Sequence, residues 1–330
     1  MTIEPLFMDS QFHEKLWGGA HMRQFGYDLP SEKTGEYWAI SGHKNGVSTV
    51  KNGEFRGVTL DSLYENNPEL FGNPTSKVFP LLTKILDAND WLSVQVHPDD
   101  AYARAHEGEN ELGKTECWYV ISAEPGAEII YGHTAKTREE LAEMIHAGAW
   151  EKLLTKIPVK TGDFFYVPSG TMHAIGAGCL ILETQQSSDT TYRVYDFDRP
   201  DVNGKLRELH IQQSIDTLSV PGNKLPENQT TTVTKGATEI TTLTENEFFD
   251  VYKWRVSGSS YFEKTDNYVL VSVLSGEGNL RVAEKNYEIK RGDHFILPST
   301  VRDFYITSLE TLEMIVSNPA VSELKKIVSQ

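Results

Sequence analysis

Two polar side chains, Gln95 and His97, stand two residues apart in the stretch SVQVHPDD. In a β-strand, residues i and i+2 point to the same side of the sheet, so these two side chains project together while the neighbouring valines face the other way. Pro98 cannot donate a hydrogen bond to a sheet and marks a strand end or an edge. An amide and an imidazole on one face therefore need a partner, which is another side chain, a substrate or a metal ion.

Two further residues could complete a metal site with this pair, namely Glu116 in GKTECWYV and His173 in VPSGTMH. Imidazole nitrogen and carboxylate oxygen suit zinc or another divalent first-row metal, whereas the amide oxygen of Gln95 is a weaker zinc ligand. Each residue also has an ordinary explanation, because Glu116 could pair with Lys114 or Lys84, and buried polar groups usually find hydrogen-bond partners. The evidence for a metal comes from the four residues together, and the candidate ligands are Gln95, His97, Glu116 and His173.

The candidate ligand His173 belongs to only one of two similar segments. Residues 162–173 read GDFFYVPSGTMH, and residues 292–303 read GDHFILPSTVRD, so that Asp303 replaces the histidine in the second copy. A strand–turn–strand pattern precedes each copy, and the first copy is longer by about the length of one helix. The repeat predicts two related β-modules, one active and one structural.

Four cations lie near these motifs. Lys84 interrupts the apolar stretch FPLLTKILDA, Lys114 stands two residues before Glu116, and Arg193 and Arg199 lie in SSDTTYRVYDFDR. Most Lys and Arg side chains are simply solvated charges. If a few of these cations instead face inward beside a metal, they would suit an anionic ligand such as a phosphate.

Most of the chain reads as short β-strands separated by Gly, Pro, Asn and Asp. A helix is expected over residues 137–154, where Thr137 and a glutamate three residues later form a capping box and Gly148 can break the run. A second short helix can begin after Asp99, which suits an N-cap. The polar, Thr-rich residues 221–246 are expected to be a linker or an edge segment.

Composition limits the classes of partner. The chain has 330 residues, 39% of them hydrophobic, and a formal net charge of −16, so nucleic acid and anionic membranes are not expected partners. Two cysteines, Cys117 and Cys179, make no disulfide framework and favour a reducing cytosol. The start lacks a secretion signal and no apolar stretch is long enough to cross a bilayer, so we expect a cytoplasmic protein.

The motifs resemble those of the type I phosphomannose isomerases, also called mannose-6-phosphate isomerases, in their short bacterial form within the cupin superfamily. The combination of QVHPDD with GKTE is specific, whereas the Gly-x5-Pro-x-Gly-x2-His pattern alone indicates only a cupin. The similarity extends over nearly the whole chain and is carried by KLWGG at 15–19, GEYWAISGH at 35–43, FPLLTKILDA at 79–88, LSVQVHPDD at 92–100, GKTECWYV at 113–120 and VPSGTMHAIG at 167–176.

The resemblance implies a mainly β fold with two cupin-type β-barrels, or jelly rolls, and a small helical insertion. Residues 1–238 would form the metal-binding catalytic domain, with the insertion near 137–154, and residues 239–330 would form a second, metal-free cupin domain. The large helical domain of longer family members is missing. The resemblance therefore assigns no residue of this chain to a phosphate contact that the longer enzymes take from that helical domain.

The resemblance also implies a reaction and roles for the site residues. The reaction interconverts mannose 6-phosphate and fructose 6-phosphate by moving a proton between C1 and C2. One zinc ion per chain would be held by the four candidate ligands, with Arg193 and Lys114 at the catalytic centre and Lys84 binding substrate. We favour Lys114 as the proton carrier, because a nearby zinc would lower its pKa, and Arg193 as electrostatic support.

Two alternatives remain from the residues themselves. A metal-dependent cupin oxygenase would use a His-rich site with open positions for iron and O2, and the clustered lysines with Gln, His, Glu and His argue against it. A non-catalytic sugar-phosphate-binding cupin is compatible with a single intact copy of the repeat. Oxygen dependence of turnover tests the first alternative, and an assay for fructose 6-phosphate tests the second.

Overall fold

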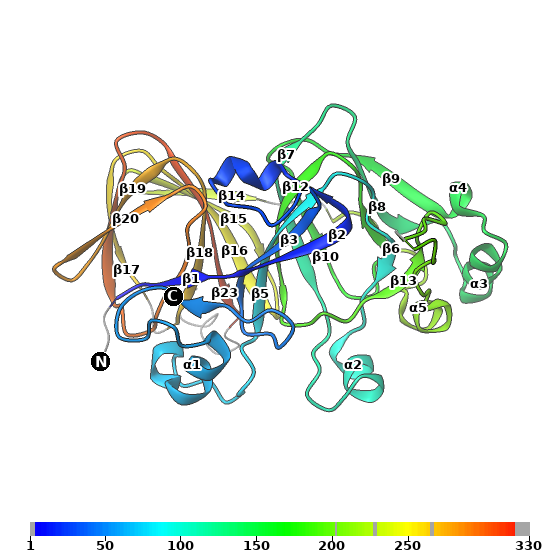
Figure 1. Cartoon of the computed structure of the whole chain (residues 1–330), viewed down its shortest axis with the longest axis horizontal. Coiled ribbons are helices and arrows are strands. Elements are labelled where there is room, and N and C mark those ends of the chain that lie inside the picture. The colour runs from blue at the N-terminus through cyan, green and yellow to red at the C-terminus, as the bar shows by residue number, and fades with distance from the viewer. Residues whose placement is uncertain (1–3, 202, 227–229, 265–266, 321–330) are drawn as a thin grey trace.

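The protein is built mainly from β-strands, as expected from the sequence (Figure 1). The computed structural model describes residues 4–320, except residues 202, 227–229 and 265–266. Within these residues the strands form four sheets, and short helices lie at the margins of the sheets. No helix in the described ranges is both long and apolar enough to span a membrane.

A six-stranded and a five-stranded sheet carry the candidate metal ligands. The six-stranded sheet has the order β10 (Phe164–Val167), β7 (Glu116–Ala123), β12 (Cys179–Gln186), β5 (Leu81–Ala88), β2 (Gln11–Gly19), β3 (Thr34–Ser41). The five-stranded sheet has the order β13 (Tyr192–Tyr195), β6 (Val94–Val96), β11 (His173–Ile175), β8 (Glu128–His133), β9 (Leu154–Pro158). Apolar side chains from both sheets, among them Trp118, Ile129 and Ile181, form one core between them.

An eight-stranded and a four-stranded sheet form the second pair. The eight-stranded sheet has the order β14 (Thr231–Lys235), β15 (Thr238–Glu245), β16 (Phe249–Val256), β23 (Leu312–Pro319), β18 (Val269–Ser275), β21 (His294–Leu297), β1 (Leu6–Asp9), β4 (Thr49–Val50). The four-stranded sheet has the order β17 (Ser259–Glu263), β22 (Asp303–Thr307), β19 (Glu277–Val282), β20 (Lys285–Lys290). Their common core includes Val273, Leu280 and Phe304.

The six-stranded and eight-stranded sheets also share a core. Tyr119 and Leu182 of the six-stranded sheet belong to the same buried cluster as Phe249 and Ile315 of the eight-stranded sheet. Alternation makes this possible, since the neighbouring residues Trp118 and Ile181 face the other way. The six-stranded sheet is therefore covered by apolar side chains on both faces.

The first strand of the chain pairs in the second group of sheets. In β1, Leu6 is opposite Ile296 and Phe7 is opposite Phe295, so the two ends of the chain meet in one sheet. The predicted division into residues 1–238 and 239–330 stays a prediction, and its extreme ends, residues 1–3 and 321–330, lie outside the described residues.

The helix expected over residues 137–154 is present as two short helices between β8 and β9, α3 (Arg138–His146) and α4 (Trp150–Leu153). The Thr137 hydroxyl accepts the N–H of Glu140 at 3.2 Å, as a capping box predicts. Gly148 interrupts the run with a φ of +62°. The helical segment expected here is thus confirmed, with the break at the glycine.

The helix expected after Asp99 is α2 (Asp100–His106), and the Asp99 carboxylate accepts the N–H of Tyr102 at 2.8 Å. The helices not predicted from the sequence are α1 (Leu60–Asn66), α5 (Ile211–Thr217) and the short 3-10 helices His21–Phe25 and Pro68–Phe71. Side chains of α3 and α5 pack with those of β6, β8 and β13 on the outer face of the five-stranded sheet. The Thr-rich segment expected as a linker or edge forms β14, the edge strand, and β15 beside it.

His294 in β21 is a buried histidine whose titration should affect stability. Its Nδ1 lies 2.9 Å from Ser272 Oγ and its Nε2 lies 2.9 Å from the Tyr27 hydroxyl. Burial lowers the pKa of His294 to about 3, from an ordinary value of 6.5. Between these two pH values the unfolded chain binds a proton that the folded protein does not, so stability falls as the pH drops below 6.5.

We expect this one histidine to remove about 2 kcal/mol of the free energy of unfolding between pH 7 and pH 5. Urea unfolding of wild type and His294→Gln at both pH values measures the effect, and the variant should lose less stability on acidification than wild type. The control is His106→Gln, which changes an exposed histidine. An equal loss in wild type and His294→Gln would contradict the assignment.

Candidate metal centre and substrate pocket

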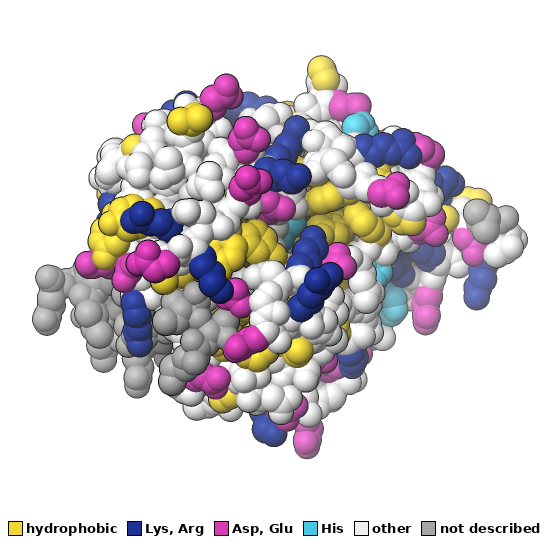
Figure 2. All heavy atoms as spheres, turned by 60° about the vertical axis from the view of Figure 1, so that its left-hand side comes forward, with side chains coloured by type: hydrophobic (Ala, Val, Ile, Leu, Met, Phe, Trp, Pro, Cys, Tyr) yellow, Lys and Arg dark blue, Asp and Glu magenta, His cyan; other side chains and the backbone are white. Residues whose placement is uncertain are grey.

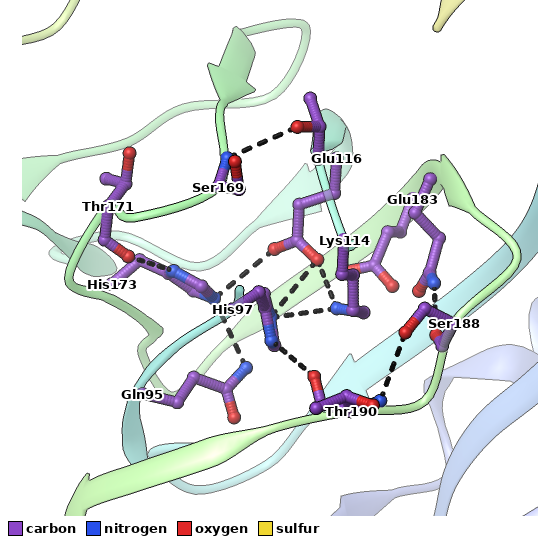
Figure 3. Close-up of polar contacts among 12 residues, drawn as sticks. Gln95, His97, Lys114, Glu116, Ser169, Thr171, His173, Glu183, Ser188 and Thr190 are labelled. Carbon is purple, nitrogen blue, oxygen red and sulfur yellow. Dashed lines mark hydrogen bonds and ion pairs between the residues drawn. The ribbon is translucent and has the colours of Figure 1, made fainter. Parts of the chain in front are cut away.

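The candidate ligands come together where the six-stranded and five-stranded sheets face each other (Figure 3). Gln95 lies in β6, and His97 follows the last residue of that strand. His173 begins β11 and is directly opposite Gln95 in the register of the five-stranded sheet. Glu116 begins β7 in the six-stranded sheet. Side chains from both sheets therefore converge on one point.

Three of these residues form a compact buried group. One possible ligand atom from each of His97, Glu116 and His173 lies within 4.8 Å of the others. The two carboxylate oxygens of Glu116 are 3.4 Å from His97 Nε2 and 3.3 Å from His173 Nε2. The amide nitrogen of Gln95 is 3.2 Å from His173 Nε2, and a half-turn of the amide would present its oxygen instead.

Backbone carbonyls orient both imidazole rings. The Nδ1 of His97 donates to Thr190 O, and the Nδ1 of His173 donates to Thr171 O, each at 2.9 Å. Burial, with Lys114 nearby, lowers the pKa of His97 to about 3, and burial also lowers the pKa of His173. Both rings are thus neutral at pH 7 and present the Nε2 lone pair toward Glu116. Metal-binding histidines are typically oriented in this way.

The buried Glu116 carboxylate carries a negative charge, which the Lys114 ammonium group balances in this structure. Burial alone would raise the pKa of Glu116, but Lys114 outweighs it and holds that pKa well below its usual value. Lys114 Nζ contacts Glu116 Oε2 and lies 2.9 Å from His97 Nε2. Two neutral imidazoles and an ionised carboxylate at this spacing fit a divalent metal.

A cavity of about 310 Å³ adjoins the cluster. The remaining residues predicted from the sequence line it, namely Lys84, Gln95, Lys114 and Arg193. Lys84 is buried, with its Nζ 3.8 Å from Glu183 Oε1 and 4.6 Å from the centre of a Trp38 ring. The structure therefore brings every predicted site residue either into the ligand cluster or onto the wall of this pocket.

The sequence interpretation missed Glu183, which also lines the pocket. The Trp118 indole N–H is 3.1 Å from both Glu183 Oε2 and Glu116 Oε1. Burial and the nearby Glu116 carboxylate raise the pKa of Glu183 to about 7. The sequence did contain a signal for this residue. Glu183 interrupts the apolar stretch CLILETQQ, just as Lys84 interrupts the apolar stretch FPLLTKILDA.

Other pocket residues were missed as well. Lys15 pairs with Glu36 at 3.2 Å, and the pKa of Glu36 is about 2, because Lys84 and Lys15 outweigh the effect of its burial. Asp189 and Arg207 also line the pocket and come from the polar segments on either side of β13. Asp189 and Arg207 belong to polar stretches that look like solvated loops in the sequence, whereas Lys15 and Glu36 stand in the motifs KLWGG and GEYWAISGH.

Comparison with known proteins identifies the family. Residues 6–119 match the family model for phosphomannose isomerase type I, catalytic domain, and residues 239–319 match that for mannose-6-phosphate isomerase, cupin domain. The chain is 62% identical over 318 residues to mannose-6-phosphate isomerase of Streptococcus mutans, covering 96% of this chain and 98% of that protein. The chain belongs to the type I phosphomannose isomerase family. The resemblance read from the sequence motifs is confirmed.

Two further family members support this assignment. The chain is 52% identical over 305 residues to mannose-6-phosphate isomerase ManA of Bacillus subtilis, covering 92% of this chain and 96% of that protein. The crystal structure of the mannose 6-phosphate isomerase from Bacillus subtilis superimposes with a TM-score of 0.91 at 49% identity, covering 95% of this chain and 99% of that one. The type I phosphomannose isomerase fold thus extends over nearly the whole chain.

Proposed function

We propose that this protein is a zinc-dependent isomerase that interconverts mannose 6-phosphate and fructose 6-phosphate. The observation that carries the proposal is a pair of neutral imidazoles around a buried carboxylate, in contact with Gln95 and Lys114 of a cation-lined pocket. Membership of the type I phosphomannose isomerase family supports the substrate and the reaction. The proposed zinc ligands are Gln95, His97, Glu116 and His173.

The reaction moves a weakly acidic proton between C1 and C2, and negative charge develops on the sugar oxygens as it leaves carbon. A zinc ion held by these ligands would act as a Lewis acid that stabilises this charge. Arg193 would add electrostatic support, because a guanidinium stays protonated at every working pH. Lys84, on the wall of the pocket, would bind the substrate.

The proton-carrying residues can be divided by their pKa values. Burial alone would lower the pKa of Lys114, but Glu116 outweighs burial and raises it, so Lys114 is an ammonium that can donate a proton to a sugar oxygen. Glu183, with a pKa of about 7, is the better base for the proton on carbon, because an effective base has a pKa near the working pH. Lys114 therefore remains in the proposal as a proton carrier, with Glu183 as its partner.

We also propose two cupin-type barrels, one from the six- and five-stranded sheets and one from the eight- and four-stranded sheets. Each pair encloses its own core, which supports this interpretation. The first barrel would be the catalytic domain within residues 1–238 and the second the metal-free domain within residues 239–330, with β1, β4 and β14 from the first range added to the second sheet group.

The proposed partner is a small sugar phosphate in the cytoplasm, without nucleic acid or membrane. Both cysteines are free and buried, which supports a reducing compartment. The net charge is −16, and Figure 2 shows Lys and Arg side chains interspersed with Asp and Glu on the visible face. Such a surface lacks the basic field that nucleic acids and anionic lipids require.

The experiment that tests this function combines metal analysis with a coupled assay for fructose 6-phosphate on one sample. We expect one zinc ion per chain and turnover of mannose 6-phosphate that does not depend on oxygen. A chelator should abolish turnover, and added zinc should restore it. Binding of the sugar phosphate without turnover would identify a non-catalytic module, and oxygen-dependent turnover would identify an oxygenase.

Arg193→Ala tests the proposed electrostatic support. Because charge on the sugar oxygens develops mainly in the transition state, we expect kcat to fall by a larger factor than KM rises. Loss of one charge-assisted contact is worth about 1.5–3 kcal/mol, or roughly ten- to a hundredfold. Steady-state kinetics with zinc analysis measures the effect. A variant with wild-type kcat would show that Arg193 takes no part in the chemical step.

A further inference from the structure

The Lys and Arg side chains that line the pocket differ in whether a carboxylate lies beside them. Each lysine lies beside a carboxylate on the inner face of the six-stranded sheet or next to it. The pairs are Lys15 with Glu36 at 3.2 Å, Lys84 with Glu183 at 3.8 Å, and Lys114 with Glu116 in direct contact. The two arginines of the pocket, Arg193 and Arg207, lie on the side of the five-stranded sheet. Arg207 is paired with Asp196 at 2.6 Å, whereas Arg193, in the part of the chain that the structure describes, donates to a backbone oxygen and not to a carboxylate.

Arg193 has hydrogen-bonding capacity that the protein does not use. Its Nη1 donates to the backbone oxygen of Glu208 at 2.7 Å. Its Nε is buried and has no hydrogen-bond partner among the described residues. Burial lowers the pKa of Arg193, and the like charge of Arg207 adds to this effect. Both guanidinium groups line the same pocket, so an anion bound there would offset their like charge.

Arg207 is held rigidly at the rim of the pocket. Its Nε and Nη2 donate to the two carboxylate oxygens of Asp196, both at 2.6 Å. A guanidinium has five N–H donors, so this fork leaves others for a ligand. The loop that carries Arg207 is tied back to β13, because His210 N donates to Arg193 O at 2.8 Å and Arg193 N donates to His210 Nδ1 at 3.1 Å.

Arg193 and Arg207 line the pocket on the side of β13. Arg193 is opposite Gln95 in the sheet, and Gln95 is opposite His173. Two strand spacings, about 10 Å, thus separate the backbones of Arg193 and His173. In the substrate, the reacting carbons C1 and C2 are at one end of the chain and the phosphate on C6 is at the other. With C1 and C2 at the metal cluster, the phosphate reaches the arginine side.

We propose that Arg207 binds the phosphate group of the substrate and thereby selects phosphorylated over neutral sugars. Arg193 lines the same pocket. Guanidinium groups suit phosphate oxygens because their planar fork donates two parallel hydrogen bonds. The inference rests on the proposed function for the identity of the substrate, and the phosphate site itself is testable separately.

Arg199 provides a matched control. It donates to the same carboxylate, with its Nη2 2.8 Å from Asp196 Oδ1, but its Nη1 is bound to Asp90 and to the backbone oxygen of Trp91. Arg199 is not among the residues that line the pocket. Arg207→Gln and Arg199→Gln each remove one charge and one partner of Asp196, so they differ in whether the lost guanidinium faces the pocket.

The first measurement is steady-state kinetics of the zinc-loaded variants with mannose 6-phosphate and with mannose. We expect Arg207→Gln to raise KM for mannose 6-phosphate by roughly ten- to a hundredfold with a much smaller change in kcat, and Arg199→Gln to leave KM near wild type. Arg207→Lys keeps a cation and should recover part of the loss. An equal rise in KM for both glutamine variants, or an equal loss on mannose and mannose 6-phosphate, would overturn the proposal.

The second measurement is calorimetric binding of inorganic phosphate to the same zinc-loaded proteins. We expect weaker binding to Arg207→Gln and unchanged binding to Arg199→Gln. If wild type lacks isomerase activity but this difference in binding persists, the proposed reaction fails while the phosphate site at Arg207 stands. If both variants bind phosphate and mannose 6-phosphate as wild type does, the site at Arg207 is wrong.

Discussion

His173→Ala should remove the bound metal and the isomerase activity together. His173 is buried, and its Nε2 faces the Glu116 carboxylate at 3.3 Å, so alanine deletes one of the two imidazole donors. Removing a residue that only hydrogen-bonds to a metal ligand weakens metal binding by about 10- to 100-fold. Removing the ligand itself should weaken metal binding by a larger factor. Metal analysis of the dialysed protein and the isomerase assay measure both effects.

The matched control is Asp303→Ala in the second copy of the repeat. Asp303 occupies the place of His173 in the repeated motif and begins β22, where it is exposed. We expect metal content and turnover in this variant to match wild type, and circular dichroism to show that both variants are folded. Full metal content in His173→Ala would rule out the proposed ligand set.

Glu183→Gln should lower kcat by about 10²- to 10⁴-fold, the usual contribution of a positioned general base. Glutamine keeps the shape of the side chain and an oxygen for the indole N–H of Trp118, but it cannot take up a proton. Zinc content should be unchanged, because Glu183 is not among the proposed ligands. Steady-state kinetics in both directions of the reaction, with metal analysis, tests this expectation.

Glu36→Gln is the control for Glu183→Gln, because it removes a buried negative charge from the pocket but leaves the proposed base, Glu183, in place. Glu36 lines the same pocket, but its pKa of about 2 makes it a poor base near neutral pH. We expect a smaller fall in kcat for this variant than for Glu183→Gln. Equal falls in the two variants would mean that pocket charge, and not proton transfer, explains the effect of Glu183.

The features predicted correctly from the sequence depend on local patterns. Strand alternation places Gln95 and His97 on one face, and the capping residues Asp99 and Thr137 mark where two helices begin. Gly148 marks where a predicted single helix divides. These features follow from residues a few positions apart, so no knowledge of sheet pairing is needed.

The missed features depend on pairing between distant strands. Glu183 lies between Lys84 and Trp118 because β12 pairs with both β5 and β7, and this register cannot be read from one strand. Arg207 lies in a charged loop, and its position at the pocket follows from the way that loop returns to β13. The pairing of β1 with β21 likewise joins residues from opposite ends of the chain.

The core shared by the six-stranded and eight-stranded sheets limits how the second copy of the repeat can diverge. This copy has Asp303 where the first copy has the proposed metal ligand His173, so no metal-binding role is proposed for that position. Its side chains at the shared core, such as Phe249 and Ile315, nevertheless cover the back of the sheet that carries Glu116 and Glu183. Side chains of the second copy at this shared core must therefore keep their volume, and we expect substitutions there to be tolerated least on the face that packs against the six-stranded sheet.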